Sequence, residues 1–310
     1  MKKKLVVLTG PTAVGKTKLS IELAKRIGGE IISADSMQVY KYMNIGSAKI
    51  TQEEMEGVPH FMVDELDPSE EFNVVVFQQK AKKYMEEIYE RGHIPILVGG
   101  TGFYIQAVLY DIDFSENEDN QGIRKELEVL AEEKGVEYLH CELGKVDPAS
   151  AEAIHANNVK RVIRALEFYR LTGQKISEHN EEQREKESPY DFSYFVLNDQ
   201  RELLYKRIDQ RVDEMAVSGL VEEVIKLREM GYDRSFVSMQ GLGYKEILSY
   251  LDGEISLEEA FYIIKRDTRH FAKRQITWFK REKEVVWVNK PEFSYDNNKI
   301  LDYMCGQINA

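Results

Sequence analysis

The chain has 310 residues, 43% of them apolar, which is enough for one large globular domain or for a core with a smaller insert. Its only cysteines are Cys141 and Cys305, which excludes a disulfide framework and a cysteine-based zinc site. The same scarcity of cysteine indicates a reducing compartment, and we expect the cytoplasm. The formal net charge is −12, so binding of nucleic acid requires a locally basic surface. No apolar run is long enough to span a membrane.

A glycine-rich turn follows the first apolar run. Residues 5–8 have the pattern of a buried strand, and residues 18–27 that of an amphipathic helix. The turn between them fits G-x-x-x-x-G-K-[ST] and consists of Gly10, Pro11, Thr12, Ala13, Val14, Gly15, Lys16 and Thr17. In this context the backbone N–H groups and the helix N-terminus form a phosphate cradle, Lys16 reaches the terminal phosphates and Thr17 binds Mg²⁺. The motif predicts a di- or triphosphate ligand but does not specify the reaction.

Short apolar segments alternate with helical patterns up to residue 112, which predicts a P-loop NTPase-like α/β fold with a parallel sheet. Ligands of such sheets bind at the carboxyl ends of the strands. Asp35 and Thr101 both follow predicted strands, so we expect them beside the phosphate loop. Asp35 is either a general base or a capping or metal-associated carboxylate. Asp64, which ends the segment 61–63, is either a Walker-B-type acid or a structural cap.

An acidic stretch, 111–120, marks a boundary, after which helical patterns dominate up to a new strand pattern at 192–197. We therefore predict an α/β core of residues 1–112 and 191–310, with a mainly helical insert at 113–190. Within the insert, the charged segment 178–188 is expected to be solvated.

Ser256 and Glu259 predict the start of a long helix that reaches about Lys280. Seven lysines and arginines, which we call the basic ridge, lie between Lys265 and Arg281 with a single acid, Asp267. They are Lys265, Arg266, Arg269, Lys273, Arg274, Lys280 and Arg281. A helical wheel places the apolar stripe elsewhere, on Leu257, Phe261, Ile264, Phe271 and Trp278. Charges of one sign repel one another, so the ridge favours an anionic partner such as a phosphate backbone.

Eight motifs follow one another along almost the whole chain. They are GPTAVGKT (10–17), ISADS (32–36), GSAK (46–49), PHFMVD (59–64), GGTGFY (99–104), RVIRALE (161–167), GLGY (241–244) and AKRQITWF (272–279). In this order they resemble the bacterial tRNA dimethylallyltransferases. The resemblance implies transfer of dimethylallyl from its diphosphate to the exocyclic amine of the adenosine 3′ of the anticodon in a subset of tRNAs. It also implies Mg²⁺ dependence and, by analogy, a nucleotide- or ATP-binding role for the phosphate loop.

The resemblance assigns roles to residues by position. Asp35 corresponds to the base for the adenine amine and Thr101 to its orienting partner, while Lys16, Thr17 and Arg211 correspond to diphosphate and metal ligands. The residues that correspond to tRNA contacts, besides Asp35 and Thr101, are Ser36, Met37, Gln38, Arg124, Lys160, Arg161, Val162, Ile163, Arg164, Gln240, Gly241, Leu242, Gly243, Tyr244, Lys245, Lys273, Arg274, Gln275, Ile276, Thr277, Trp278, Phe279 and Lys280. We expect the anticodon stem-loop as the partner, no membrane and a monomer.

Two other functions fit the phosphate loop. A small-molecule kinase would use Asp35 as its base and the insert as a lid, but a small metabolite does not require the basic ridge. A nucleotide-gated RNA-binding protein would use the ridge without chemistry, but the sequence carries no clear guanine-reading or switch signature.

Overall fold

The computed structural model describes residues 2–114 and 121–309 and divides into two compact units. The first unit comprises Met1–Leu109 and Pro189–Ala310, and the second comprises Tyr110–Ser188. The insert expected from the sequence covers 113–190, so the two pairs of limits differ by two or three residues. Residues 115–120 of the expected acidic boundary lie outside the described part of the chain.

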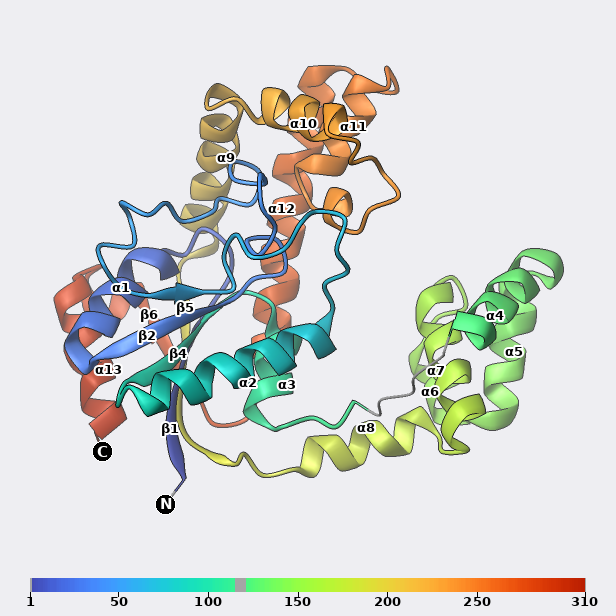
Figure 1. Ribbon diagram of the computed structural model, residues 1–310, viewed down its shortest axis with the longest axis horizontal. Coiled ribbons are helices and arrows are strands. Elements are labelled where there is room, and N and C mark those ends of the chain that lie inside the picture. The colour runs from blue at the N-terminus through green and yellow to red at the C-terminus, as the bar shows by residue number, and fades with distance from the viewer. Residues whose placement is uncertain (1, 115–120, 310) are drawn as a thin grey trace. The chain divides into compact units, whose positions relative to one another are not determined.

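The first unit is built on a six-stranded sheet whose strands are all parallel, which confirms the predicted α/β fold (Figure 1). The strands lie in the order β3 (His60–Phe61), β2 (Gly29–Ala34), β4 (Ile94–Gly99), β1 (Lys3–Thr9), β5 (Tyr190–Asn198) and β6 (Val285–Asn289). All six residues of β2 and the last five of β1 are buried, as expected for strands covered on both faces. This explains why these segments have continuous rather than alternating apolar patterns.

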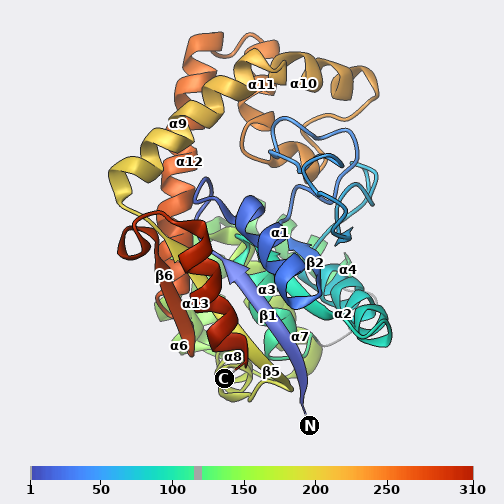
Figure 2. The same ribbon diagram turned by 90° about the vertical axis from the view of Figure 1, so that its left-hand side faces the viewer.

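Helices cover both faces of the sheet. Figures 1 and 2 show α1 (Lys16–Ile27) beside α13 (Asn297–Asn309) on one face, and α2 (Val74–Glu90) with α3 (Gly102–Leu109) on the other. Two longer helices, α9 (Arg201–Val217) and α12 (Leu257–Phe279), pack against each other, and α12 also contacts α3. The elements α10 (Leu220–Glu229), η1 (Ser238–Gln240) and α11 (Tyr244–Leu251) connect them, and η2 (Lys290–Phe293) precedes α13.

The strand register brings three loops to one level at the carboxyl edge of the sheet. Thr9 of β1 and Ala34 of β2 both pair with Gly99 of β4. A Cβ atom on Gly99 would lie 2.2 Å from the carbonyl oxygen of Ala34, so only glycine permits this approach. The phosphate loop, the loop that begins at Asp35 and the turn that carries Thr101 therefore start side by side.

The second unit is helical and has its own apolar core. It contains α4 (Gln121–Lys134), α5 (Val136–Val146), α6 (Pro148–Ala153), α7 (Val159–Thr172) and α8 (Ile176–Glu185). The core is formed by Leu127, Leu139, Leu143, Val162, Ile163, Ala165 and Leu166. Asp147 is buried and accepts hydrogen bonds from the backbone N–H groups of Ser150 and Ser177, which joins α6 to α8. The charged segment expected to be solvated is largely exposed and forms most of α8.

Candidate functional site

The phosphate loop has the backbone that an anion cradle requires. Gly10 has a φ of +145°, and a Cβ atom there would lie 2.5 Å from the carbonyl oxygen of Leu197. Gly15 has a φ of +95° and leads directly into α1, whose N-terminus points its free N–H groups toward the loop. Lys16 Nζ donates to the carbonyl oxygens of Gly10 and Pro11, each at 3.0 Å. The ammonium group thus lies against the phosphate loop, where we expect it to bind the phosphates of the ligand.

Three charged side chains meet around this loop. Burial and, to a smaller extent, the charge of Arg211 lower the pKa of Lys16 to about 8, against the opposing effect of Asp35. Burial also lowers the pKa of Arg211, while Glu214 and Asp35 raise it. Arg211 extends from α9, with its terminal nitrogen 3.5 Å from Thr12 Oγ1. The structure therefore brings together Lys16, Arg211 and Asp35, although Arg211 lies almost two hundred residues further along the chain.

Asp35 is oriented by the backbone that follows it. Its Oδ1 accepts hydrogen bonds from the N–H groups of Met37 at 2.8 Å and Gln38 at 3.4 Å, which fixes the carboxylate in a tight turn. Within the described part of the chain its Oδ2 has no hydrogen-bond partner, so this oxygen is available to accept a proton. Thr101 lies nearby, because its backbone N–H donates to the carbonyl oxygen of Ala34 at 3.2 Å.

Gln275, on α12, links the phosphate loop to the turn that carries Thr101. Its Oε1 accepts a hydrogen bond from the Thr12 N–H, and its Nε2 donates to the Gly100 carbonyl oxygen, both at 2.9 Å. The side chain is 6% exposed, and a Cβ atom on Gly100 would lie 2.1 Å from its amide nitrogen. One buried amide thus fixes the distance between the phosphate loop and the turn that carries Thr101.

The buried side of α12 lies on the apolar face that the wheel predicted, but its most buried members differ from those expected. Of the five apolar residues on the predicted stripe, only Ile264 is buried. The buried residues are Ala260, Ile264, Ala272, Gln275 and Phe279. At ~100° per residue these five positions lie on the same side of the helix as the predicted stripe, whose other members, Leu257, Phe261, Phe271 and Trp278, are half-buried. The close packing of α12 selects alanines and the bridging amide of Gln275 as its most buried positions.

The basic ridge divides into two parts. Lys265 pairs with Asp213 at 2.5 Å, Arg269 pairs with Asp209, and Arg266 pairs with Asp267 at 2.8 Å. The other cations, Lys273, Arg274, Lys280 and Arg281, are exposed and form no ion pair among the described residues. Residues of this second part line an open hollow of about 370 Å³ with His270, Thr277 and Trp278. Only this half of the ridge retains the uncompensated charge that the sequence predicted for all of it.

Some side chains in the predicted tRNA-contacting stretches are buried and have other partners. They are Val162, Ile163, Tyr244, Gln275 and Phe279. A buried side chain cannot contact RNA in this conformation, so we exclude these five from the proposed surface. Lys160, Arg161 and Arg164 on α7 are exposed, as is Arg124 on α4, which pairs with Glu128 at 3.4 Å. Thr17 is exposed in the first turn of α1.

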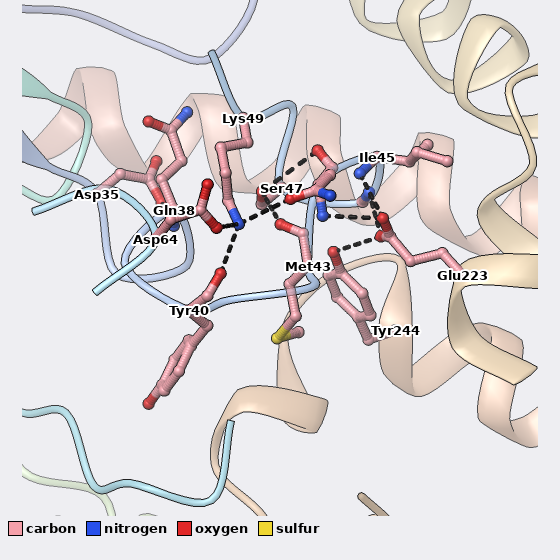
Figure 3. A network of polar contacts seen from close by, with 12 residues as sticks. Asp35, Gln38, Tyr40, Met43, Ile45, Ser47, Lys49, Asp64, Glu223 and Tyr244 are labelled. Atoms are coloured by element: carbon pink, nitrogen blue, oxygen red, sulfur yellow. Dashed lines mark hydrogen bonds and ion pairs between the residues drawn. The ribbon is translucent and has the colours of Figure 1, made fainter. Parts of the chain in front are cut away.

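Asp64 binds a lysine of its own unit (Figure 3). Its Oδ1 lies 2.6 Å from Lys49 Nζ, whose side chain is 3% exposed. The same ammonium group donates to the Tyr40 carbonyl oxygen at 2.5 Å and to Asn44 Oδ1 at 2.9 Å. This contact favours the structural interpretation of Asp64, because its carboxylate neutralises a buried cation. The sequence analysis did not predict a role for Lys49 or for Glu223, which lies in the same network of contacts. The available signals were the GSAK motif, which contains Lys49, and the GLGY motif, whose Tyr244 binds Glu223.

The described residues contain no group of three or more His, Cys, Asp or Glu side chains that could hold a metal ion. None of their helices combines the length and the apolar character needed to cross a bilayer.

Comparison with known proteins agrees with this geometry. The family model described as IPP transferase matches residues 38–282. A tRNA dimethylallyltransferase of Lachnoclostridium phytofermentans is 66% identical over 94% of this chain and 93% of its own length, and one of Acetivibrio thermocellus is 55% identical over 96% and 95%. The solved tRNA isopentenylpyrophosphate transferase of Bacillus halodurans is 46% identical, with a TM-score of 0.75 over 99% of this chain and 97% of its own. A solved eukaryotic dimethylallyltransferase acting on tRNA is 35% identical, with a TM-score of 0.78 over 93% and 74%. The phosphate loop, the carboxylate beside it and the extent of these matches show that the chain belongs to the IPP transferase family.

Proposed function

We propose that this protein transfers a dimethylallyl group from dimethylallyl diphosphate to the exocyclic amine of the adenosine 3′ of the anticodon in a subset of tRNAs. The observation that carries the proposal is the convergence of Lys16, Arg211 and Asp35 around the phosphate loop. It is supported by the 66% and 55% identity of the chain to two tRNA dimethylallyltransferases over nearly their whole length. Two cations and a set of N–H donors suit a diphosphate leaving group, and a carboxylate at its edge suits the adenine amine.

The reaction requires one bond to form as another breaks. The adenine N6 attacks C1 of the dimethylallyl group, the C1–O bond breaks, and its electron pair leaves with the diphosphate. Asp35 takes the proton that the amine loses, a contribution of about 10²–10⁴-fold in typical general-base catalysis. Thr101 holds the amine in line with C1. Lys16, Arg211 and the loop N–H groups stabilise the charge that develops on the diphosphate.

The donor atoms at the loop fit a magnesium ion that is held mainly by the substrate. No carboxylate cluster of the described chain forms an all-protein cage, whereas Thr17 offers a hydroxyl in the first turn of α1. Mg²⁺ commonly binds through substrate phosphates, water and one or two protein oxygens. When bound, the ion would supply charge neutralisation on the diphosphate.

The exposed cations provide surfaces for the tRNA backbone. On the first unit these are Lys273, Arg274 and Lys280, with Trp278 in the hollow beside them. On the second unit they are Lys160, Arg161 and Arg164 on α7, with Arg124 on α4. The target base must leave its stack to reach Asp35, which is the behaviour of other enzymes that modify bases. We further propose that the protein acts as a monomer in the cytoplasm.

The test uses labelled dimethylallyl diphosphate, Mg²⁺ and an unmodified tRNA anticodon stem-loop. We expect the label to become bound covalently to the RNA. Phosphoryl transfer from labelled ATP to a small molecule would support the kinase instead. RNA binding that depends on a nucleotide but leaves no label on the RNA would support the switch, and either result would overturn the proposal.

A further inference from the structure

Glu223 is a buried carboxylate that binds a loop far from it in sequence. It lies on α10, is 9% exposed, and faces residues 44–46, as Figure 3 shows. Its Oε2 accepts from the N–H groups of Asn44 and Ile45, both at 2.8 Å, and its Oε1 accepts from the Gly46 N–H at 3.1 Å. Three successive N–H groups thus form a nest around one carboxylate.

Tyr244 completes this arrangement. Its hydroxyl donates to Glu223 Oε1 at 2.8 Å, and burial keeps the pKa of this hydroxyl well above its ordinary value, so it remains a donor. A Cβ atom on Gly46 would lie 2.6 Å from the Tyr244 ring. The GSAK and GLGY motifs therefore fit together because glycine leaves room for the ring that positions the carboxylate.

Residues 48 and 49 of the same loop are connected by polar contacts to the segment that holds Asp35. Ala48 accepts a hydrogen bond through its carbonyl oxygen from Gln38 Nε2 at 3.2 Å, and Lys49 binds Asp64, whose N–H donates to the Gln38 carbonyl oxygen at 3.1 Å. Gln38 in turn donates its own N–H to Asp35 Oδ1. We call this series of contacts the relay. Each of them is a hydrogen bond or an ion pair between residues of the stretch 35–64.

We infer that Glu223 is a positioning residue for the transfer reaction: it fixes residues 44–49, and through them Gln38, which together with Met37 orients Asp35. The inference rests on the proposed function, because it gives Asp35 the part of the base. The phosphate loop belongs to different elements, β1 and α1, so the position of the diphosphate does not depend on this relay. Loss of Glu223 should therefore affect chemistry more than diphosphate binding.

The first experiment measures amide hydrogen exchange at residues 36–49 in Glu223→Gln, and needs no enzymatic activity. Glutamine keeps the volume of the side chain but turns an NH₂ group toward N–H donors. The matched control is Glu30→Gln. Glu30 is also buried, binds Arg91 at 2.6 Å, and lies on β2 close to its start, whereas Asp35 follows the end of that strand. We expect exchange at residues 44–46 to quicken about tenfold or more in Glu223→Gln and to stay unchanged there in Glu30→Gln.

The second experiment is a double-mutant cycle with Asp35→Asn, read by single-turnover transfer and by diphosphate affinity. Misplacement of the base by about 1 Å can lower the rate by up to ~10²-fold, so we expect Glu223→Gln to reduce it by about 10–10²-fold. In the Asp35→Asn background the same change should lower the rate by less than about threefold, because the group it positions is already gone. The diphosphate dissociation constant should change by less than about twofold in Glu223→Gln, as expected for a group that acts through Asp35 alone.

Each outcome decides one question. Equal rate losses in both backgrounds, or unchanged exchange at residues 44–46, would overturn the inference. Absence of transfer by the unmodified protein would overturn the proposed function, and the exchange experiment would still decide whether Glu223 fixes the loop. If Glu223→Gln does not fold, Tyr244→Phe replaces it, because this variant removes only one of the four hydrogen bonds to the carboxylate. Both measurements are then made on Tyr244→Phe, and we expect changes in exchange and in transfer rate in the same directions.

Discussion

Replacing Gln275 with leucine should disturb the active site and the stability of the first unit together. The Gly100 carbonyl is buried, and an unpaired buried acceptor costs about 1–3 kcal/mol. Thr12 is partly exposed, so water can replace part of its lost bond and the cost is nearer 0.5–1 kcal/mol. The free energy of unfolding should therefore fall by about 1.5–4 kcal/mol, which for a unit of this size lowers Tm by about 3–16 °C. The freed loops should also lower the single-turnover transfer rate by about tenfold or more, because alignment at the reacting atoms is demanding.

The assays are calorimetric unfolding and single-turnover transfer at a temperature where both variants are folded. The matched control is Gln210→Leu on α9, an exposed glutamine that donates to Glu214 at 2.8 Å. Its free energy of unfolding should change by no more than about 0.5 kcal/mol. A Gln275→Leu protein with the Tm and rate of the control would refute the assignment of Gln275 as the link between the two loops.

Three further predictions concern the substrates. Lys16→Ala should abolish most transfer yet leave tRNA affinity nearly unchanged in filter binding, and ATP hydrolysis as fast as prenyl transfer in the unmodified protein would contradict a diphosphate role for the loop. Replacing Lys273 and Arg274 with alanine should reduce the slope of log affinity for tRNA against log salt by about one for each lost phosphate contact, and replacing Arg266, which is paired with Asp267, should change it less. Asp35→Asn should slow single-turnover transfer by about 10²–10⁴-fold without loss of tRNA affinity, and near-normal rates at saturating Mg²⁺ would instead make Asp35 a metal-site residue.

The sequence predicted correctly those features whose interactions involve only neighbouring residues. The phosphate loop could be read from the sequence because one turn supplies all its donors. The start of α12 was predicted in the same way, and Ser256 indeed accepts a hydrogen bond from the Glu259 N–H. The strand ends placed Asp35 and Thr101 beside the loop because parallel strands share one carboxyl edge.

Contacts between distant segments could not be derived from spacing alone. Gln275 stands among exposed lysines and arginines, and nothing local shows that its amide is buried between two loops. Arg269 was expected to be free because the stretch from Lys265 to Arg281 contains a single acid, but its partner Asp209 lies on α9. Glu223 lies in a charged stretch that reads as an ordinary exposed helix. Its hydrogen bonds to residues 44–46 depend on the packing of α10 against that loop, which the sequence does not reveal.

The central claim is tested most directly by one turnover of the unmodified protein on a defined tRNA, followed by identification of the modified nucleoside. The RNA is digested after reaction with labelled dimethylallyl diphosphate and Mg²⁺, its nucleosides are analysed by mass spectrometry, and released diphosphate is measured in the same sample. The mechanism predicts a dimethylallyl group on N6 of the adenosine 3′ of the anticodon, with one diphosphate released for each adenosine modified. Unmodified adenosine at that position, or diphosphate release without transfer to RNA, would contradict it.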